Sequence, residues 1–395
     1  MCAKVRFENV KKYNSLRGRA LVLLLFFWFV WFMTFVARAI FSPVLPIVED
    51  EFAVSHSQAA SIFTVTGLGY ALSLFFSGTY ASLLGPRRTI LFATAVSGIM
   101  LLLIPFVRVF ELFYVLGFIL GVSLGAYIPS VIPFITAYYA EDVWGKAIAV
   151  HGSAPSVAVF LTPFIALAIL SFLPWRGVFV LPGVAFLCCT LIFFFISRGA
   201  TLGKGKDVFL ASLLKSKAIW IMGIVSLFAA GANIGLYYII PLYLVKELYL
   251  PMDYANSIFG ISRLGGAVVT IVAGFFVDRI SLKKVSFGLV FATGILTILI
   301  TLSGAKWIGL FLFLQASISP AFFPFGYVAV ARLFNQEQRG QAAGFVITIG
   351  MIGTGLVPYF LGLSGDLASF RLGIFVLGIC TALSSGLLYF LKELK

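Results

Sequence analysis

The chain has 395 residues, of which 61% are apolar and only 11% are charged, and its mean hydropathy is +1.09. These values lie far outside the range of soluble globular domains and predict a polytopic membrane protein. The net charge of +14 does not indicate a nucleic-acid partner, because the basic residues collect in the termini and loops that flank apolar blocks, beside anionic lipid headgroups.

Twelve apolar blocks follow one another along the chain. Each has about 20 residues or more, which is enough to cross a hydrocarbon core of about 30 Å as a helix. A transmembrane barrel would show alternating segments of about ten residues, which these blocks lack. We therefore expect an all-α integral membrane protein with spans at 21–46, 57–81, 89–107, 111–137, 145–171, 176–196, 218–245, 254–277, 285–303, 307–332, 341–363 and 372–391.

Basic residues indicate the orientation, because Lys and Arg are retained on the cytoplasmic side of a membrane. The termini and the loops on their side carry 21 of them, and the opposite loops carry five, namely Arg108, Arg176, Lys246, Lys306 and Arg371. Both termini, 1–20 and 392–395, are therefore expected in the cytoplasm. The first block is too long for a cleaved signal peptide, and the sequence favours a prokaryotic cytoplasmic (inner) membrane.

The two halves of the chain, 21–196 and 218–391, align with each other at an offset of 195 to 196 residues. Each half would form a six-helix bundle, and the basic segment 197–217 would be a cytoplasmic linker. Two similar bundles with a site between them are typical of secondary transporters, which expose the site to each side in turn. The matched positions include Pro46 with Pro241, Pro129 with Pro324, and Gly145 with Gly340.

Two loops carry motifs. Residues 274–284 contain Gly, Asp-Arg and Lys-Lys at fixed spacing, and residues 337–340 read Glu-Gln-Arg-Gly. These motifs resemble those of the major facilitator superfamily, and the resemblance covers essentially the whole chain. It implies twelve helices in two bundles, a central cavity and alternating access. It also implies a gating contact at the start of the fifth span that involves Asp278, Arg279 and Lys146. The first half departs from the motif, because Ser82 stands at the acidic position.

Two arginines, Arg38 and Arg263, lie inside predicted spans, and no Asp or Glu is expected at a comparable depth. A guanidinium at the centre of a span costs about 2.5 to 3.5 kcal/mol on insertion scales, so it needs a compensating partner. An anionic ligand would supply one, since arginine binds carboxylate and phosphate in a bidentate manner. Each half contributes one arginine, so a single anion could bridge the halves. Alternatively, Arg38 could extend to the interface or bond to helix carbonyls.

Other polar residues lie within the spans. His151 could carry a coupling proton or donate a hydrogen bond to the ligand, or it could be a packing residue. A further set could orient a ligand, or could form hydrogen bonds between helices. This set is Asn233, Tyr237, Tyr127, Tyr70, Gln315 and Tyr327.

The expected function is alternating-access secondary transport of a small organic anion by proton-coupled symport or anion exchange. A mono- or dicarboxylate is favoured and an organophosphate comes next, in agreement with the resemblance to organic-anion branches of the superfamily. The alternative is an exporter of hydrophobic or neutral compounds of the drug-efflux type, which the aromatic content of 16% would suit. The absence of an acidic residue within a span argues against that type.

An enzyme is not expected, because the sequence has no phosphate-cradling loop, nucleophile elbow or metal-binding histidine pair. An integral-membrane enzyme or a transporter-like sensor is a remote alternative. The four cysteines lack metal-ligand spacing, so neither a metal nor another cofactor is expected. The partners would be the anion, possible coupling protons and the lipid bilayer, with the chain acting as a monomer.

Overall fold

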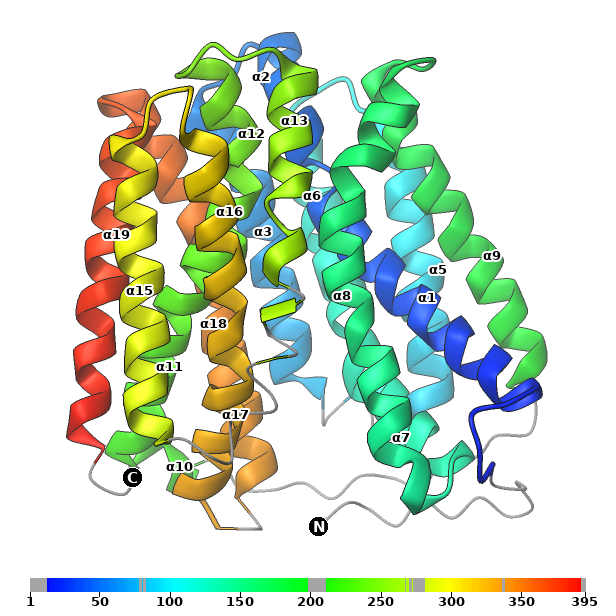
Figure 1. Ribbon diagram of the computed structural model, residues 1–395. Helices are drawn as coiled ribbons and strands as arrows, with labels where there is room; N and C mark the ends of the chain where they lie inside the picture. The colour runs from blue at the N-terminus through cyan, green and yellow to red at the C-terminus, as the bar shows by residue number, and fades with distance from the viewer. Residues whose placement is uncertain are drawn as a thin grey trace. The chain divides into compact units, whose positions relative to one another are not determined.

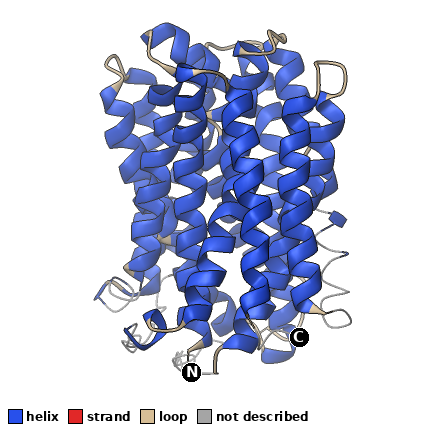
Figure 2. Cartoon of the chain, turned by 90° about the vertical axis from the view of Figure 1, so that its left-hand side faces the viewer, coloured by secondary structure: helices blue, strands red, loops and turns tan. Residues whose placement is uncertain are grey.

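The computed structural model describes residues 13–77, 80, 83–197, 211–266, 268–269, 272, 281–335 and 338–391. These residues are helical or form short connections, apart from an isolated bridge between Tyr13 and Tyr139 (Figures 1 and 2). Eleven helical segments within them are long and apolar enough to cross a membrane. The expectation of an all-α membrane fold is confirmed. The remaining predicted span, 254–277, begins as α13 (Met252–Ile261), but most of its second half lies outside the described residues.

The chain divides into two compact units, which are described separately. The first unit contains Met1–Ile40, Gly69–Val159 and Ile169–Asp207. Within it, α5 packs against α6, α7 and α9, and α1 packs against α7 and α9. Its helices are α1 (Arg19–Ala39), the end of α3 (His56–Phe75), α5 (Gly85–Leu103), η2 (Ile104–Phe106), α6 (Glu111–Gly125), α7 (Tyr127–Tyr138), most of α8 (Glu141–Leu170), η3 (Trp175–Phe179) and α9 (Val180–Ile196).

The second unit contains Phe41–Leu68, Phe160–Ala168 and Val208–Lys395. It thus includes segments from the first half of the sequence. In this unit α15 packs against α19, and α11 packs against α18. Besides α13 it contains η1 (Ser42–Val44), α2 (Leu45–Phe52), the start of α3, α10 (Ala211–Leu214), α11 (Lys217–Ala230), η4 (Gly231–Gly235), α12 (Leu236–Lys246), α15 (Leu282–Leu302), α16 (Ile308–Ile318), η5 (Ser319–Ala321), α17 (Phe322–Leu333), α18 (Arg339–Leu367), α19 (Phe370–Gly386) and η6 (Leu387–Phe390).

The first span is longer than predicted. The helical run that begins with α1 continues through η1, where Pro43 lies in the first turn, and ends with α2 at Phe52. Arg38 therefore lies 14 residues before the end of the run and not eight residues from it.

Glycines allow close helix contacts at corresponding places in the two halves. In the first unit a Cβ on Gly98 of α5 would stand 2.9 Å from the carbonyl oxygen of Gly183 in α9. In the second unit a Cβ on Gly294 of α15 would stand 2.7 Å from the carbonyl oxygen of Gly378 in α19. The pairs are related by the offset found in the sequence. The repeat therefore corresponds to a repeated helix–helix contact, in which only glycine leaves room for the facing backbone.

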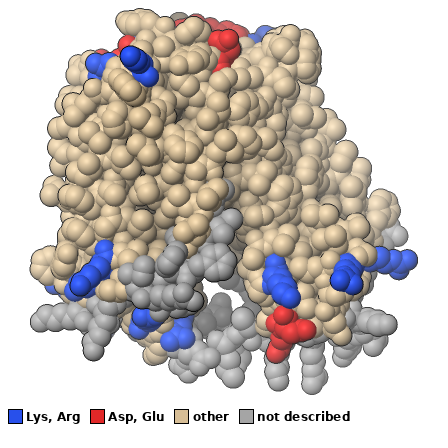
Figure 3. Space-filling view, viewed as in Figure 1, with Lys and Arg blue, Asp and Glu red and all other residues tan. Residues whose placement is uncertain are grey.

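Charged side chains collect at the two ends of the spans. On the face drawn in Figure 3, the described Lys, Arg, Asp and Glu side chains lie near the upper and lower edges, and the band between them shows almost none. Large apolar side chains such as Phe92, Val115 and Leu191 are exposed within the helices. This distribution suits a lipid environment, because placing a charged side chain in the hydrocarbon core costs about 3 kcal/mol of free energy on insertion scales.

Candidate functional site

The sequence predicts that Arg263 lies within an unbroken helix. In the structure it lies at an interruption in its span. Helix α13 ends at Ile261, residues 262 and 263 form a turn, and the amide of Arg263 donates to the carbonyl of Gly260 at 3.0 Å. Helical geometry resumes at residues 264–266. Interrupted helices are common at the binding sites of secondary transporters, because the interruption frees backbone and side-chain groups for a ligand.

The guanidinium of Arg263 is held by two oxygens of a single residue. Its Nη1 donates to Oδ1 of Asn233, and its Nη2 donates to the backbone carbonyl of Asn233, both at 2.8 Å. The ring of Tyr237 covers the group, with its centroid 4.1 Å from Cζ of Arg263. The buried Nε has no hydrogen-bond partner among the described residues. Since both acceptors are neutral, these hydrogen bonds orient the guanidinium without neutralising its charge.

Asn233 lies in the π-helical segment η4, where the amide of Leu236 donates to the carbonyl of Gly231. A π-helical turn shifts the helix hydrogen bonds by one residue and releases carbonyls from the usual pattern. Gly231 and Gly235 are the first and last residues of this segment. Oδ1 of Asn233 also accepts a hydrogen bond from Ser319 at 3.0 Å, a residue that the sequence analysis did not identify.

Gln315 supports the same segment. Its Nε2 donates to the carbonyl of Ala232 at 2.9 Å and to Oγ1 of Thr297 at 3.3 Å. The structure thus brings Arg263, Asn233, Tyr237 and Gln315 into one polar cluster in the second unit. The cluster is supplied by η4, α12, the turn that follows α13, α16 and η5. We refer to these four residues, with Ser319, as the Arg263 cluster.

Arg38 lies in the first unit, where it is only 5% exposed. Its Cζ is 4.3 Å from the ring centroid of Tyr70 in α3 and 5.1 Å from that of Phe35 in α1. A cation over an aromatic face is stabilised by the quadrupole of the ring. Arg38 and Arg263 therefore each pack against a tyrosine that the sequence predicts as a site residue.

His151 lies in α8 of the same unit and is 2% exposed. The ring of Trp31 stacks on it with centroids 5.8 Å apart, and its Nε2 is 3.4 Å from the hydroxyl of Tyr127. That hydroxyl also donates to the carbonyl of Phe27 at 2.8 Å. The structure thus pairs His151 with one predicted site residue, Tyr127, and with one that was not predicted, Trp31.

The remaining predicted residues are dispersed. Tyr327 lies on α17 and is 47% exposed, and Lys146 is an exposed residue near the start of α8. Asp278 and Arg279, which the gating prediction requires, lie outside the described residues.

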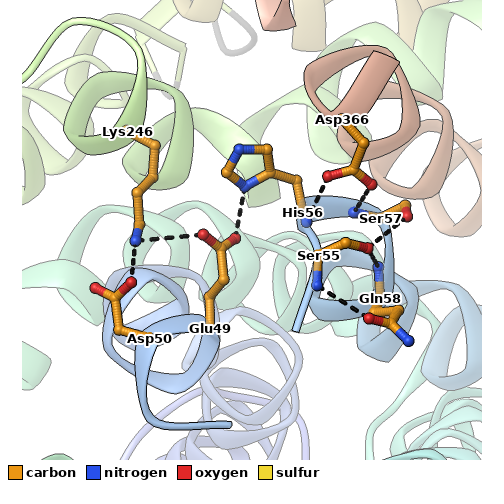
Figure 4. Close-up of polar contacts among 8 residues, drawn as sticks. All are labelled: Glu49, Asp50, Ser55, His56, Ser57, Gln58, Lys246 and Asp366. Carbon is orange, nitrogen blue, oxygen red and sulfur yellow. Dashed lines mark hydrogen bonds and ion pairs between the residues drawn. The ribbon is translucent and has the colours of Figure 1, made fainter. Parts of the chain in front are cut away.

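One expectation about acidic residues is wrong. Glu49 is 5% exposed near the end of the first span, so a carboxylate is buried there. Its Oε1 lies 3.3 Å from Nζ of Lys246, and its Oε2 lies 2.8 Å from Nδ1 of His56 (Figure 4). Lys246 also forms an ion pair with Asp50. The ammonium of Lys246 balances the charge of Glu49 and the imidazole of His56 forms a hydrogen bond with it, so the carboxylate is buried with partners other than the arginines in the spans.

A second carboxylate in Figure 4 binds a helix end. Asp366, near the end of α18, accepts hydrogen bonds from the backbone amides of His56 at 2.8 Å and Ser57 at 2.9 Å. The first amides of an α-helix lack partners within the helix, and its N-terminus carries a partial positive charge. Asp366 therefore supplies acceptors for the first amides of α3 and places a negative charge at the positive end of this helix. Because 310 residues separate Asp366 and His56, no local sequence signal indicates this contact.

Comparisons with known proteins can be set against this geometry. A family model, the Major Facilitator Superfamily, matches residues 27–313 and 252–395. The chain belongs to this superfamily. It is a multi-pass membrane transport protein and not an enzyme.

Relatives of this superfamily member cover most of its length. It is 22% identical over 403 residues to a probable hexose phosphate transport protein of Chlamydia trachomatis, covering 90% of this chain and 86% of the relative. It is 23% identical over 376 residues to the membrane sensor protein UhpC of Escherichia coli, covering 85% and 84% of the two chains.

Solved structures share the fold of this superfamily member. A bacterial homologue of the lysosomal transporter Spinster, in an inward-facing and occupied conformation, matches with a TM-score of 0.81 and 13% identity over 96% of this chain and 98% of the other. A D-xylose–proton symporter matches with a TM-score of 0.78 and 15% identity over 96% and 98%. At these identities the likeness establishes the fold alone.

Proposed function

We propose that this protein is an alternating-access secondary transporter of a small organic anion, with phosphorylated sugars as the favoured class. The observation that carries the proposal is the guanidinium of Arg263. Within the described residues its hydrogen-bond acceptors are the neutral oxygens of Asn233, so its charge is available to an anion. A phosphate group offers several oxygens to a guanidinium, and the pair forms short, charge-assisted hydrogen bonds.

The names of the relatives favour an organophosphate over the carboxylates that ranked first in the sequence analysis. Three relatives that match most of this chain are described as probable hexose phosphate transport proteins. A phosphate monoester carries more negative charge than a monocarboxylate near neutral pH. It therefore compensates better for the cost of placing arginines in spans.

We propose the remaining roles from the sequence and from the resemblance to the superfamily. Arg38 and Arg263 bind the anion, one from each half of the chain. His151 is the candidate for proton coupling in symport, while exchange of two anions needs no such group. Asp278, Arg279 and Lys146 gate the cytoplasmic side. The protein functions as a monomer in a cytoplasmic membrane with both termini inside. The residues that orient the sugar or its phosphate are Tyr237, Tyr127, Tyr70, Gln315 and Tyr327, while Asn233 positions Arg263.

Uptake into proteoliposomes tests the substrate class. We expect uptake of labelled glucose 6-phosphate to exceed that of labelled succinate or lactate, and to fall by about 100-fold in Arg263→Ala, since that change removes hydrogen bonds to a charged group. Arg263→Lys keeps the charge without the bidentate geometry and should retain part of the uptake. Full activity of both Arg38→Ala and Arg263→Ala would refute an anion site at these residues. Efflux of lipophilic toxins that is unaffected by Arg263→Ala would instead indicate a drug exporter.

A sensor is the second candidate, because one relative is the membrane sensor protein UhpC. A sensor and a transporter can share an anion site and differ in whether the ligand crosses the membrane. Ligand binding raises the thermal stability of purified protein in both cases. A phosphate-dependent thermal shift without flux into proteoliposomes would identify a sensor.

A further inference from the structure

The contact between Arg263 and Asn233 has the geometry of arginine bound to an anion. The two terminal nitrogens of the guanidinium face two oxygens, each at 2.8 Å, as they would face a carboxylate or phosphate group. One of these oxygens is a side-chain amide oxygen, and the other is a backbone carbonyl within the π-helical segment. Neither carries a formal charge, so an anion would bind the same nitrogens more strongly.

We propose that Asn233 is an internal placeholder for the anion: it holds Arg263 in the ligand-free protein, and the ligand displaces it. This proposal rests on the proposed function. Displacement does not leave the amide oxygen without a partner, because Ser319 already donates to it at 3.0 Å. It also does not require Arg263 to move far, because the ring of Tyr237 keeps the guanidinium in place from one face.

The placeholder also couples binding to the shape of a span. Asn233 lies in η4, between α11 and α12, and Arg263 donates to the carbonyl of Asn233 within this π-helical segment. When the anion takes Arg263, this carbonyl is free to accept a bond from its own helix. The π-helical turn can then tighten toward α-helix, which rotates α12 relative to α11. Ligand binding would thus change the position of one half of the seventh span.

Two substitutions of Asn233 test the proposal in opposite directions. Asn233→Ala removes the side-chain competitor. We expect glucose 6-phosphate to bind about tenfold more tightly, the equivalent of one hydrogen bond to a charged group, while the ligand-free protein loses thermal stability. Asn233→Asp supplies a permanent anion, so binding should fall by at least about 100-fold while the ligand-free protein gains stability. Titrations of purified protein and thermal melts measure both quantities.

Controls separate this proposal from its alternatives. Gln315→Glu adds a carboxylate to the same cluster away from the Arg263 nitrogens, and it should weaken binding less than Asn233→Asp. If Asn233→Ala fails to fold, Asn233→Ser provides the same test. Weaker binding in a folded Asn233→Ala or Asn233→Ser variant would show that Asn233 contacts the ligand and would overturn the placeholder. If Arg263→Ala abolishes binding of glucose 6-phosphate while the Asn233 variants bind it as the unchanged protein does, the proposed function stands and the placeholder is overturned.

A second observation carries an independent inference. The contacts in Figure 4 join segments from the two halves of the sequence inside the second unit. Lys246, at the end of α12, pairs with Glu49 and Asp50 in α2, and Asp366, at the end of α18, binds the first amides of α3. The distribution of basic residues assigns this end of the spans to the outside.

We infer that these residues form a latch that holds the outer side closed. Glu49 is buried only while Lys246 and His56 face it, so opening must either expose its carboxylate or leave it without the ammonium partner. Opening would also remove Asp366 from the N-terminus of α3. The neighbouring charged pair, Glu247 with Arg371, joins α12 to the start of α19 within the second half and can persist in both states.

Spin labels test the latch. One label is placed at Ala53, after α2, and the other at Leu367, at the end of α18, in protein whose natural cysteines have been replaced by alanine. The distance between the two labels is then measured. Lys246→Met keeps the alkyl chain and removes the charge, and we expect it to increase the population with a long distance between the labels. Lys306→Met, an exposed change on the same side, is the matched control. An unchanged distance distribution in Lys246→Met and in Asp366→Asn would overturn the latch. The measurement needs no substrate, so it stands apart from the proposed function.

Discussion

At the scale of single residues, Arg38 and Arg263 are stabilised in a similar way in the two halves of the chain. Arg38 packs on Tyr70 with 4.3 Å between Cζ and the ring centroid, and Arg263 packs on Tyr237 with 4.1 Å. The face of an aromatic ring lowers the cost of burying a cation by about 0.5 to 2 kcal/mol without neutralising it. A tyrosine partner therefore stabilises each guanidinium and leaves its charge in place for an anion.

This interpretation predicts different effects for two substitutions of Tyr237, whose ring also stacks on Phe259 with centroids 4.0 Å apart. Tyr237→Phe retains the aromatic face, so the affinity for glucose 6-phosphate should change by less than about threefold. Tyr237→Leu removes the face, and the affinity should fall by about tenfold, equivalent to a cation–π contribution of about 1.4 kcal/mol. Isothermal titration of purified protein measures both. Equal losses would show that the hydroxyl of Tyr237 binds the ligand and that the ring does not matter.

The sequence identified the residues of the Arg263 cluster better than it identified their contacts. Arg263 and Asn233 could be selected because polar groups in apolar spans are rare. Their pairing depends on a π-helical turn and on an interrupted α13, and neither follows from hydrophobic periodicity. The burial of Glu49 could not be predicted for a related reason. Its partner Lys246 is remote in sequence, and each residue by itself has the pattern of a solvated loop charge.

At the scale of elements, the length of the apolar runs was sufficient to predict the spans, because only a helix of about 20 residues satisfies its own backbone across a bilayer. The ends of the helices were less predictable. The first span continues to Phe52 because Ser42 and Pro43 form a 3₁₀ turn inside it and do not end it. The sequence offset between halves reappears as the paired contacts of Gly98 with Gly183 and of Gly294 with Gly378.

Two glycines of α15 provide a matched test of these contacts. A Cβ on Gly294 would meet the backbone of α19, whereas one on Gly288 would meet nothing within 4 Å. Gly294→Ala should therefore force the helices apart and lower the stability by about 1 to 3 kcal/mol, the usual cost of overpacking. Gly288→Ala should leave it unchanged or raise it by up to about 1 kcal/mol, because alanine is the better helix former. Thermal melts in detergent compare the two, and similar melting temperatures would argue against a tight contact between α15 and α19.

At the scale of the whole molecule, the loop charges predict one orientation in the membrane. Lys215, between α10 and α11, and Lys306, between α15 and α16, are both exposed, but the first lies on the side with 21 basic residues and the second on the side with five. In cells that express protein free of natural cysteines, a membrane-impermeant maleimide should label Lys306→Cys in intact cells and Lys215→Cys only after permeabilisation. The reverse pattern would place the termini outside, and it would move the latch of Glu49, Lys246 and Asp366 to the cytoplasmic side. The same labelling experiment therefore decides whether opening of this latch exposes the anion site to the outside or to the cytoplasm.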